Sequence, residues 1–435
     1  MGQKQLLKRL SAVTLAVVMT TGLTACNSTL IQRVGQSLGL GGNNASSGVT
    51  PIPIDLPPQT QAHLRDYDTA VAALQQFYRD ADKVGKEWQT LATQNREKIA
   101  QGVDDATFIQ LVSETIAAVQ DEDVVLLPPE APVQPTAPLT ATYSGIGVLV
   151  GLPEAGKDRL LALYVYPDSP AERAGVRSHD SIVAIDGNAV TFEDRNTLVT
   201  QLHGEVGSKV VLTVRTPGQP EREVTVTRRP VRPSSPMVYE FVPGTNIAYI
   251  APNPTQLFEM RNDTADAMRE LQNAGTIDGL VLDLRVIRGT EFPMADMLSL
   301  FVNGKVANLQ LRTVKNALEI TGKSIAGSQD VPMVILVSNN TQGQVVAFAG
   351  ILQSLGRARI VGEPTQARVA VLNTINLPNL GARLQIPSGD YLSLKNANWY
   401  QTGVEPDTKA DRTWEEITAE DDAQLNQAVD LLQGR

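Results

Sequence analysis

Cysteine is almost absent from this sequence: the 435 residues include only one. A single thiol excludes an intrachain disulfide and a cluster of cysteines around a metal ion. Basic residues are in the minority, so the formal net charge is −10. Nucleic acids and anionic lipid surfaces both demand basic patches, which argues against nucleic acid as a partner. We also expect no metal site and no other cofactor, since neither His179 nor His203 has a second ligand at a useful spacing.

The apolar run near the N-terminus, residues 10–23, is too short to cross a bilayer comfortably. Basic residues precede it, and it leads into the letters LTAC, which end at Cys26. Small residues before a cysteine suit a peptidase that cuts just ahead of a lipidated thiol. We therefore expect residues 1–25 to be a lipoprotein signal peptide. Lipid on Cys26 would anchor the chain to a membrane of the cell envelope, on the extracytoplasmic side. A short membrane anchor with an incidental cysteine is the alternative.

The first part of the mature chain divides by composition. About 410 residues remain after the signal, enough for two or three domains. Residues 26–60 are rich in Gly, Ser, Asn and Pro, which is typical of a flexible tether. Apolar residues recur at helical spacing in 61–127 and predict a small helical module. Five prolines from Pro128 to Pro138 cannot continue a helix and indicate a domain boundary.

The remainder divides into three parts by pattern. Residues 141–231 show short strands with glycine turns, and residues 237–410 alternate strands with helices. That alternation predicts an α/β core with a partly parallel sheet. Residues 411–435 end the chain with an amphipathic helix.

Short glycine-containing motifs follow one another in residues 141–231. They are YSGIGV at 143–148, SPA at 169–171, AGV at 174–176 and DSIVAIDG at 180–187. Their order resembles a PDZ domain of the bacterial kind over about ninety residues. The resemblance implies an inserted β-sandwich or barrel that binds polypeptide C-termini or an envelope protein partner, with the peptide added as a strand.

The same resemblance implies which residues bind the peptide. Backbone amides around Gly145, Ile146 and Gly147 would hold the terminal carboxylate, because glycine allows close approach. Apolar side chains would line the pocket between strand and helix: Val148, Val150, Val199 and Leu202. The alternative is that these four are core residues of the domain. His179 fits a turn at positive φ, and His203 fits an electrostatic cap at a helix end.

Four motifs in residues 237–410 resemble the carboxyl-terminal processing serine peptidases, also called tail-specific peptidases. They are the strand ending in DLR at 283–285, the strand, loop and helix of 334–352, GRARIVGE at 356–363 and GVEPD at 403–407. With the helical module and the PDZ insertion, the resemblance covers most of the mature chain and implies a ClpP/crotonase-like core. Such enzymes use a serine at the start of a helix, a neutral lysine as base and a glutamine that orients the lysine.

All three of those positions are replaced here. Alignment of 337–352 puts Gly343 in place of the serine, the lysine 25 positions further on becomes Arg368, and the glutamine four residues later becomes Leu372. Glycine has no nucleophile, and leucine forms no side-chain hydrogen bond. A guanidinium with a pKa above about 12 cannot act as a general base. The resemblance therefore implies a catalytically degenerate member. Arg368 would instead bind a peptide carboxylate or pair with a structural acid such as Glu363.

The loop at 286–290 corresponds to the one that supplies glycine amides to the oxyanion. Gly289 remains, but the second glycine position is β-branched and the loop has gained bulk and charge, so we expect no preorganised oxyanion site. Ser338 and Thr341 lie close to Gly343 in sequence without a lysine or histidine nearby. Their simplest role is to cap the helix that begins near Gln344.

Three functions stay open at this point. The first, which we favour, is a silent relative of the processing peptidases that binds polypeptide tails. The second is an active serine peptidase that cleaves envelope proteins near their C-termini, with a serine and a lysine brought together by the fold, such as Ser338 or Ser388 with Lys395. The third is a scaffold with a closed PDZ groove and helices used for dimerisation.

Overall fold

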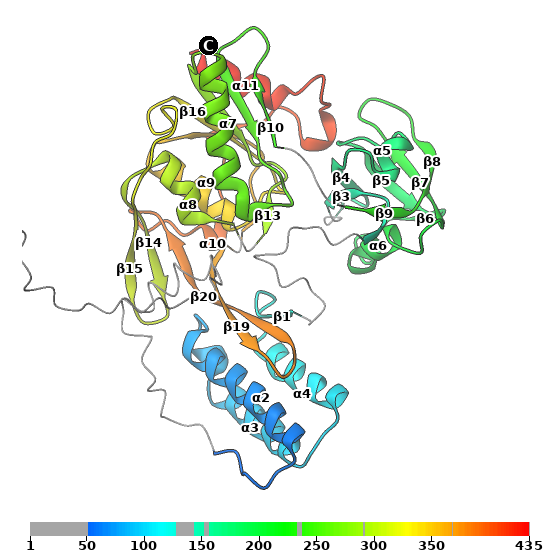
Figure 1. Ribbon diagram of the computed structural model, residues 1–435, viewed down its shortest axis with the longest axis vertical. Helices are drawn as coiled ribbons and strands as arrows, with labels where there is room; N and C mark the ends of the chain where they lie inside the picture. Colours follow the sequence, from blue (N-terminus) through cyan, green and yellow to red (C-terminus); the bar gives the residue numbers. More distant parts are fainter. Residues whose placement is uncertain are drawn as a thin grey trace, which may run out of the picture. The chain divides into compact units, whose positions relative to one another are not determined.

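The computed structural model describes residues 51–127, 143–151, 156–232, 237–289, 292–367 and 369–434. Four predicted features lie wholly or mostly outside the described residues: Cys26 with the signal peptide, the tether up to residue 50, the proline-rich passage, and Arg368. Within the described ranges, no helix combines the length and apolarity needed to span a bilayer. An N-terminal helical module, a small β-sheet domain and an α/β core follow one another along the chain (Figure 1).

The helical module comprises α2 (Pro58–Phe77), η1 (Asp82–Val84), α3 (Lys86–Ala100) and α4 (Asp105–Ala117). Helix α2 takes residues 58–60 from the predicted tether, because proline is favoured in the first turn of a helix, where its missing N–H is not needed. Asp104 caps α4 by accepting a hydrogen bond from the amide of Thr107. The buried cluster of this module includes Tyr67 and Phe108, in the range 61–127 for which helical spacing predicted a module.

A five-stranded antiparallel sheet joins the module to the core. Its strands are β1 (Val125–Leu127), β14 (Gly304–Leu311), β15 (Lys315–Ile320), β19 (Ala370–Leu377) and β20 (Ala382–Leu392). In Figure 1 the long β19–β20 hairpin reaches the helices of the module, and Leu377 and Leu384 belong to the module's buried cluster. Asp66 of α2 accepts the backbone amide of Leu380 at 2.6 Å, which fixes the hairpin turn on the helix.

The β-sheet domain contains β2 (Tyr143–Gly145), β3 (Val148–Gly151), β4 (Leu160–Val165), α5 (Pro170–Arg173), β5 (Ser181–Ile185), β6 (Asn188–Ala189), α6 (Arg195–Leu202), β7 (Lys209–Arg215), β8 (Arg222–Thr227) and β9 (Arg229–Val231). Its main sheet has the order β3-β4-β5-β7-β8, with β6 beside β5, and β2 pairs separately with β9. Strand β3 pairs with β4 alone and is therefore an edge strand of that sheet.

The α/β core is built on β10 (Val238–Phe241), β11 (Ile247–Ala251), β12 (Gly279–Asp283), β16 (Met333–Val337), β18 (Arg359–Gly362) and β21 (Thr408–Lys409), in that spatial order. Every neighbouring pair is parallel except β10 with β11. The predicted partly parallel sheet is thus confirmed. Residues along the central strands alternate between two apolar clusters, so both faces are buried, as parallel sheets require.

Helices cover both faces of this sheet. They are η2 (Leu257–Glu259), α7 (Met260–Ala274), α8 (Met294–Phe301), α9 (Gln344–Ser354), α10 (Trp399–Thr402), η3 (Trp414–Glu416) and α11 (Ala423–Leu432). Helices α7, α8 and α9 contribute to the larger cluster, while α11 packs Ala428 against Val281 and Val334 on the other face. The predicted C-terminal helix is present.

Candidate active site and peptide-binding edge

The position aligned with the nucleophile is Gly343, the residue directly before α9. Two short strands meet there: β13 (Arg288–Gly289) and β17 (Gln342–Gly343) pair in parallel, with Gly289 opposite Gly343. Gly343 has φ 77° and ψ −150°, a backbone conformation that favours glycine. A Cβ atom at this residue would lie 2.3 Å from the carbonyl oxygen of Gly289. The space that a nucleophilic side chain would need is therefore filled by backbone.

The two hydroxyls nearest to Gly343 have structural partners. Ser338 Oγ donates to the carbonyl of Arg285 at 2.6 Å, and Thr341 Oγ1 donates to the carbonyl of Leu284 at 2.9 Å. Both residues are fully buried. Helix α9 receives no side-chain cap, so the predicted capping role for these residues is wrong. Their hydrogen bonds instead join the loop after β16 to the loop after β12. Strands β12 and β16 are parallel neighbours, so these bonds hold their ends together.

The alternative serine and lysine are not brought together among the described residues. Ser388, in β20, is buried and donates to the carbonyl of Val371 at 3.1 Å. Lys395 is exposed in the turn after β20. Leu372, the position aligned with the orienting glutamine, is partly exposed in β19, opposite Pro387 at a β-bulge. Ser338 and Ser388 thus donate to backbone carbonyls rather than to a lysine amine.

The predicted peptide-binding residues lie around the edge strand β3. Gly145, Ile146 and Gly147 are buried and precede this strand, and Gly147 has φ 84°. A Cβ at Gly147 would meet Ser169 Cβ at 2.4 Å, so glycine is required here for packing. The four predicted pocket side chains belong to one apolar cluster: Val150 and Leu202 are buried in it, and Val148 and Val199 are half-buried against it.

The side chain of Tyr143 lies at the predicted carboxylate site and is hydrogen-bonded to the backbone of Gly147. Burial raises the pKa of Tyr143, while a hydrogen bond from the Gly147 amide to its hydroxyl acts in the opposite direction. The Tyr143 ring stacks on His203, with 4.9 Å between ring centroids. Burial also lowers the pKa of His203 and favours its neutral form, which does not support the predicted electrostatic cap. A peptide carboxylate would thus take the place of the phenol oxygen.

Family comparisons decide the identity of the two larger domains. Residues 246–410 match the model of peptidase family S41, and residues 162–216 match that of the PDZ domain. Residues 246–410 are thus a peptidase S41 domain and residues 162–216 a PDZ domain, the combination that makes the chain similar to the carboxyl-terminal processing proteases. A carboxyl-terminal-processing protease of Synechocystis is 27% identical over 331 residues, 74% of this chain and 76% of the relative. The processing protease CtpB of Bacillus subtilis is 24% identical over 382 residues, 85% of this chain and 75% of the relative.

A solved structure extends the likeness in fold to the whole architecture. The photosystem II D1 C-terminal processing protease superposes with a TM-score of 0.58 at 23% identity, over 87% of this chain and 97% of that one. The N-terminal helices, the inserted PDZ sheet and the mixed α/β core are the S41 processing-protease fold. The sequence-based fold class is therefore confirmed.

The family's DLR motif has a structural role here. Arg285 is buried and forms hydrogen bonds to Asp283, Asp422 and Gln424, the last two at the start of α11. Burial alone would raise the pKa of Asp283, but the charge of Arg285 holds it below its ordinary value. Tyr249 donates to the same carboxylate at 2.7 Å. This network attaches the C-terminal helix to the end of β12.

Several contacts join the S41 core to the PDZ domain that the sequence does not predict. His179 has φ 76°, and its Nδ1 lies 2.8 Å from the carbonyl oxygen of Trp414. Arg288 Nη2 donates to the carbonyl of Val150 at 2.6 Å. A Cβ at Gly151 would meet Asn340 Oδ1 at 2.7 Å. These partners are far apart in sequence, and no local pattern marks them.

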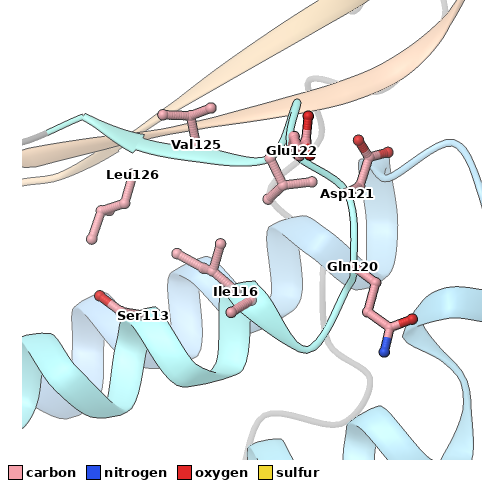
Figure 2. A pocket seen from close by; sticks show the side chains of 9 residues that line it. Ser113, Ile116, Gln120, Asp121, Glu122, Val125 and Leu126 are labelled. Atoms are coloured by element: carbon pink, nitrogen blue, oxygen red, sulfur yellow. The ribbon is translucent and has the colours of Figure 1, made fainter. Parts of the chain in front are cut away.

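A hollow of about 550 Å³ lies elsewhere, between α4 and β1. Figure 2 shows Ser113 and Ile116 on the helix, Val125 and Leu126 on the strand, and the acidic turn between them. No lysine or histidine is among the described residues that line it, so the family's serine and lysine pair is not found there. None of the predicted site residues lies in this hollow.

Proposed function

We propose that this chain is a catalytically silent S41 homologue that binds polypeptide C-termini through its PDZ domain. The observation that carries the proposal is at Gly343, where the residue has no side chain and the carbonyl of Gly289 occupies the space of one. Acyl transfer by the family's mechanism needs a hydroxyl at that point and an amine that can lose its proton. Arg368 supplies no such amine, since guanidinium stays charged.

The loop around Gly289 supports the same proposal. An oxyanion site needs backbone N–H groups directed at the developing charge. Here the carbonyl oxygen of Gly289 lies 2.3 Å from where a Cβ of residue 343 would be, so a partial negative charge lies beside the aligned nucleophile position. This arrangement would repel an oxyanion.

A cleavage assay tests directly whether the chain lacks peptidase activity. A fragment beginning near residue 51, which keeps the whole of α2, would be incubated with an unfolded protein that carries an apolar tail. We expect no time-dependent cleavage. Cleavage that survives removal of contaminating proteases would favour the alternative, an active serine peptidase acting on envelope proteins near their C-termini. That alternative draws support from the relatives, which are named as proteases.

Peptide binding is tested by comparing a peptide with a free carboxylate with its amidated twin. The edge position of β3 supports an added strand, and the glycines before it support a carboxylate site. We expect the free acid to bind more tightly. Equal binding, or none, would favour a scaffold with a closed groove instead.

We further propose that lipid on Cys26 holds the protein to a membrane of the cell envelope, on the extracytoplasmic side. The support is the basic, apolar and LTAC pattern of residues 1–26. Mass spectrometry of the mature N-terminus would detect a diacylated cysteine, and Cys26→Ala should release the protein from membranes. An unmodified N-terminus at Met1 would contradict the proposal.

A further inference from the structure

The edge of β3 is contacted by a cation from the degenerate active site. Arg288 directly precedes Gly289, the residue that fills the nucleophile position, and its Nη2 donates to the carbonyl of Val150 at 2.6 Å. The two residues are 138 positions apart, so the fold alone brings the former oxyanion loop to the peptide-binding strand.

That carbonyl is directed away from the rest of the sheet. Ala162 is the partner of Val150 in β4, but its amide and carbonyl are bonded to the backbone of Asp180 and His179. The Val150–Ala162 pair is thus not a hydrogen-bonded pair of the antiparallel ladder, and the polar groups of Val150 point to the open side of β3. An added peptide strand would use these groups.

The register of such a peptide follows from the carboxylate site. With the carboxylate at Gly145–Gly147 and the peptide antiparallel to β3, the last residue lies opposite Val148 and the third-last opposite Val150. The third-last amide would then compete with Arg288 for the Val150 carbonyl. The fourth-last residue would lie opposite Gly151.

The face on which each peptide side chain would lie also follows from β3. Val150 faces the interior of the PDZ domain, whereas Leu149 packs in a cluster with Val286 and Trp414 of the core. Side chains opposite one another in a ladder share a face, so the second-last and fourth-last side chains would face the core. Gly151 has no side chain, and Asn340 of the core lies against it. The fourth-last side chain would therefore lie between Arg288 and Asn340.

Arg288 carries a charge that the described residues do not neutralise. Burial lowers its pKa to about 10, which leaves it cationic at neutral pH. No carboxylate of the described residues lies within ion-pair distance of it. A half-buried guanidinium that loses the Val150 carbonyl needs another acceptor, and a carboxylate is the strongest one available.

We propose that Arg288 selects peptides with an acidic side chain at the fourth-last position: the peptide backbone displaces it from Val150, and the peptide carboxylate replaces the lost acceptor. The inference rests on the proposed peptide-binding function. It makes a residue of the former catalytic loop a specificity-determining residue of the PDZ edge.

The test uses the mature full-length chain in detergent and three fluorescent ten-residue peptides that end in an apolar residue and a free carboxylate. They differ only in Glu, Gln or Lys at the fourth-last position. Anisotropy titration should give a dissociation constant about tenfold lower for Glu than for Gln, the size of one charge-assisted hydrogen bond. Lys should bind more weakly than Gln.

Variants assign the preference to Arg288. Arg288→Gln should bind the Glu and Gln peptides equally, and Arg288→Lys should keep part of the preference. Arg269→Gln removes the same charge from the exposed face of α7 and should keep all of it. Equal affinity of the wild-type chain for Glu and Gln would overturn the inference while leaving peptide binding intact. Absence of binding by every free-carboxylate peptide would overturn both the proposed function and this inference.

Discussion

Replacing Gly343 with alanine will destabilise the core, because two penalties act at this residue. Its dihedral angles, φ 77° and ψ −150°, lie near a region that essentially only glycine occupies, and another residue there costs about 1–3 kcal/mol. The new Cβ would also lie 2.3 Å from Gly289 O, where ordinary contacts begin at 3.4 Å. Moving backbone to relieve this overlap costs about another 1–3 kcal/mol, so the expected loss is about 2–6 kcal/mol.

The assay is thermal unfolding, with Gly244→Ala as the matched control. Gly244 has φ 76°, but a Cβ there would meet no atom within 4 Å, so this variant carries only the backbone penalty. For a domain of this size, about 1 kcal/mol corresponds to about 2–4 °C in Tm. We expect Gly343→Ala to lower Tm by several degrees more than Gly244→Ala. Equal shifts would refute the conclusion that the Gly289 carbonyl fills the nucleophile position.

The same geometry predicts the outcome of restoring the family's residues. A chain with Gly343→Ser, Arg368→Lys and Leu372→Gln should not hydrolyse an unfolded protein, because the Cβ of the new serine would overlap the Gly289 carbonyl, and that acceptor would lie beside the reacting group. Circular dichroism must first show that the variant is folded. Time-dependent cleavage by the folded variant would show that the loop opens readily and that only the side chains were missing.

Three further predictions concern other parts of the molecule. Arg285→Leu leaves Asp283 and Asp422 without their cation and should lower the free energy of unfolding by about 3–5 kcal/mol in a urea titration; a loss below about 1 kcal/mol would contradict the network's role. Burial lowers the pKa of His179, so its contribution to stability is present above its unfolded pKa of about 6.5 and is lost as pH falls below it. His179→Asn, which tolerates the positive φ, should therefore lose less Tm than the wild type between about pH 7.5 and about pH 5, and equal losses would exclude this histidine as a source. Gly147→Ala should abolish binding of free-carboxylate peptides because its Cβ would meet Ser169 at 2.4 Å, whereas Gly187→Ala, at φ 78° in open space, should bind normally.

Sequence periodicity predicted helices and strands reliably where the element buries one face or both faces. Helical spacing in 61–127 predicted the module whose core contains Tyr67 and Phe108, and the alternation of strands with helices in 237–410 predicted the sheet that contains β12 and β16. These features are local, because burial selects residue types at the period of the element itself. The start of α2 was set three residues too late, since a proline inside a Pro-rich stretch also fits the first turn of a helix.

Residue identity and spacing are enough to align Gly343 with the family's nucleophile and to predict the amphipathic helix at the C-terminus. The folded structure is needed to see which backbone group lies against Gly343 and which groups the neighbouring side chains bind. Three contacts illustrate this: the Gly289 carbonyl lies against Gly343, Ser338 donates to Arg285, and Arg288 donates to Val150. The residues in each contact are between 53 and 138 positions apart in the sequence. Such contacts depend on how strand ends and domains are arranged in space, and the periodicity of residue types along the chain does not predict that arrangement.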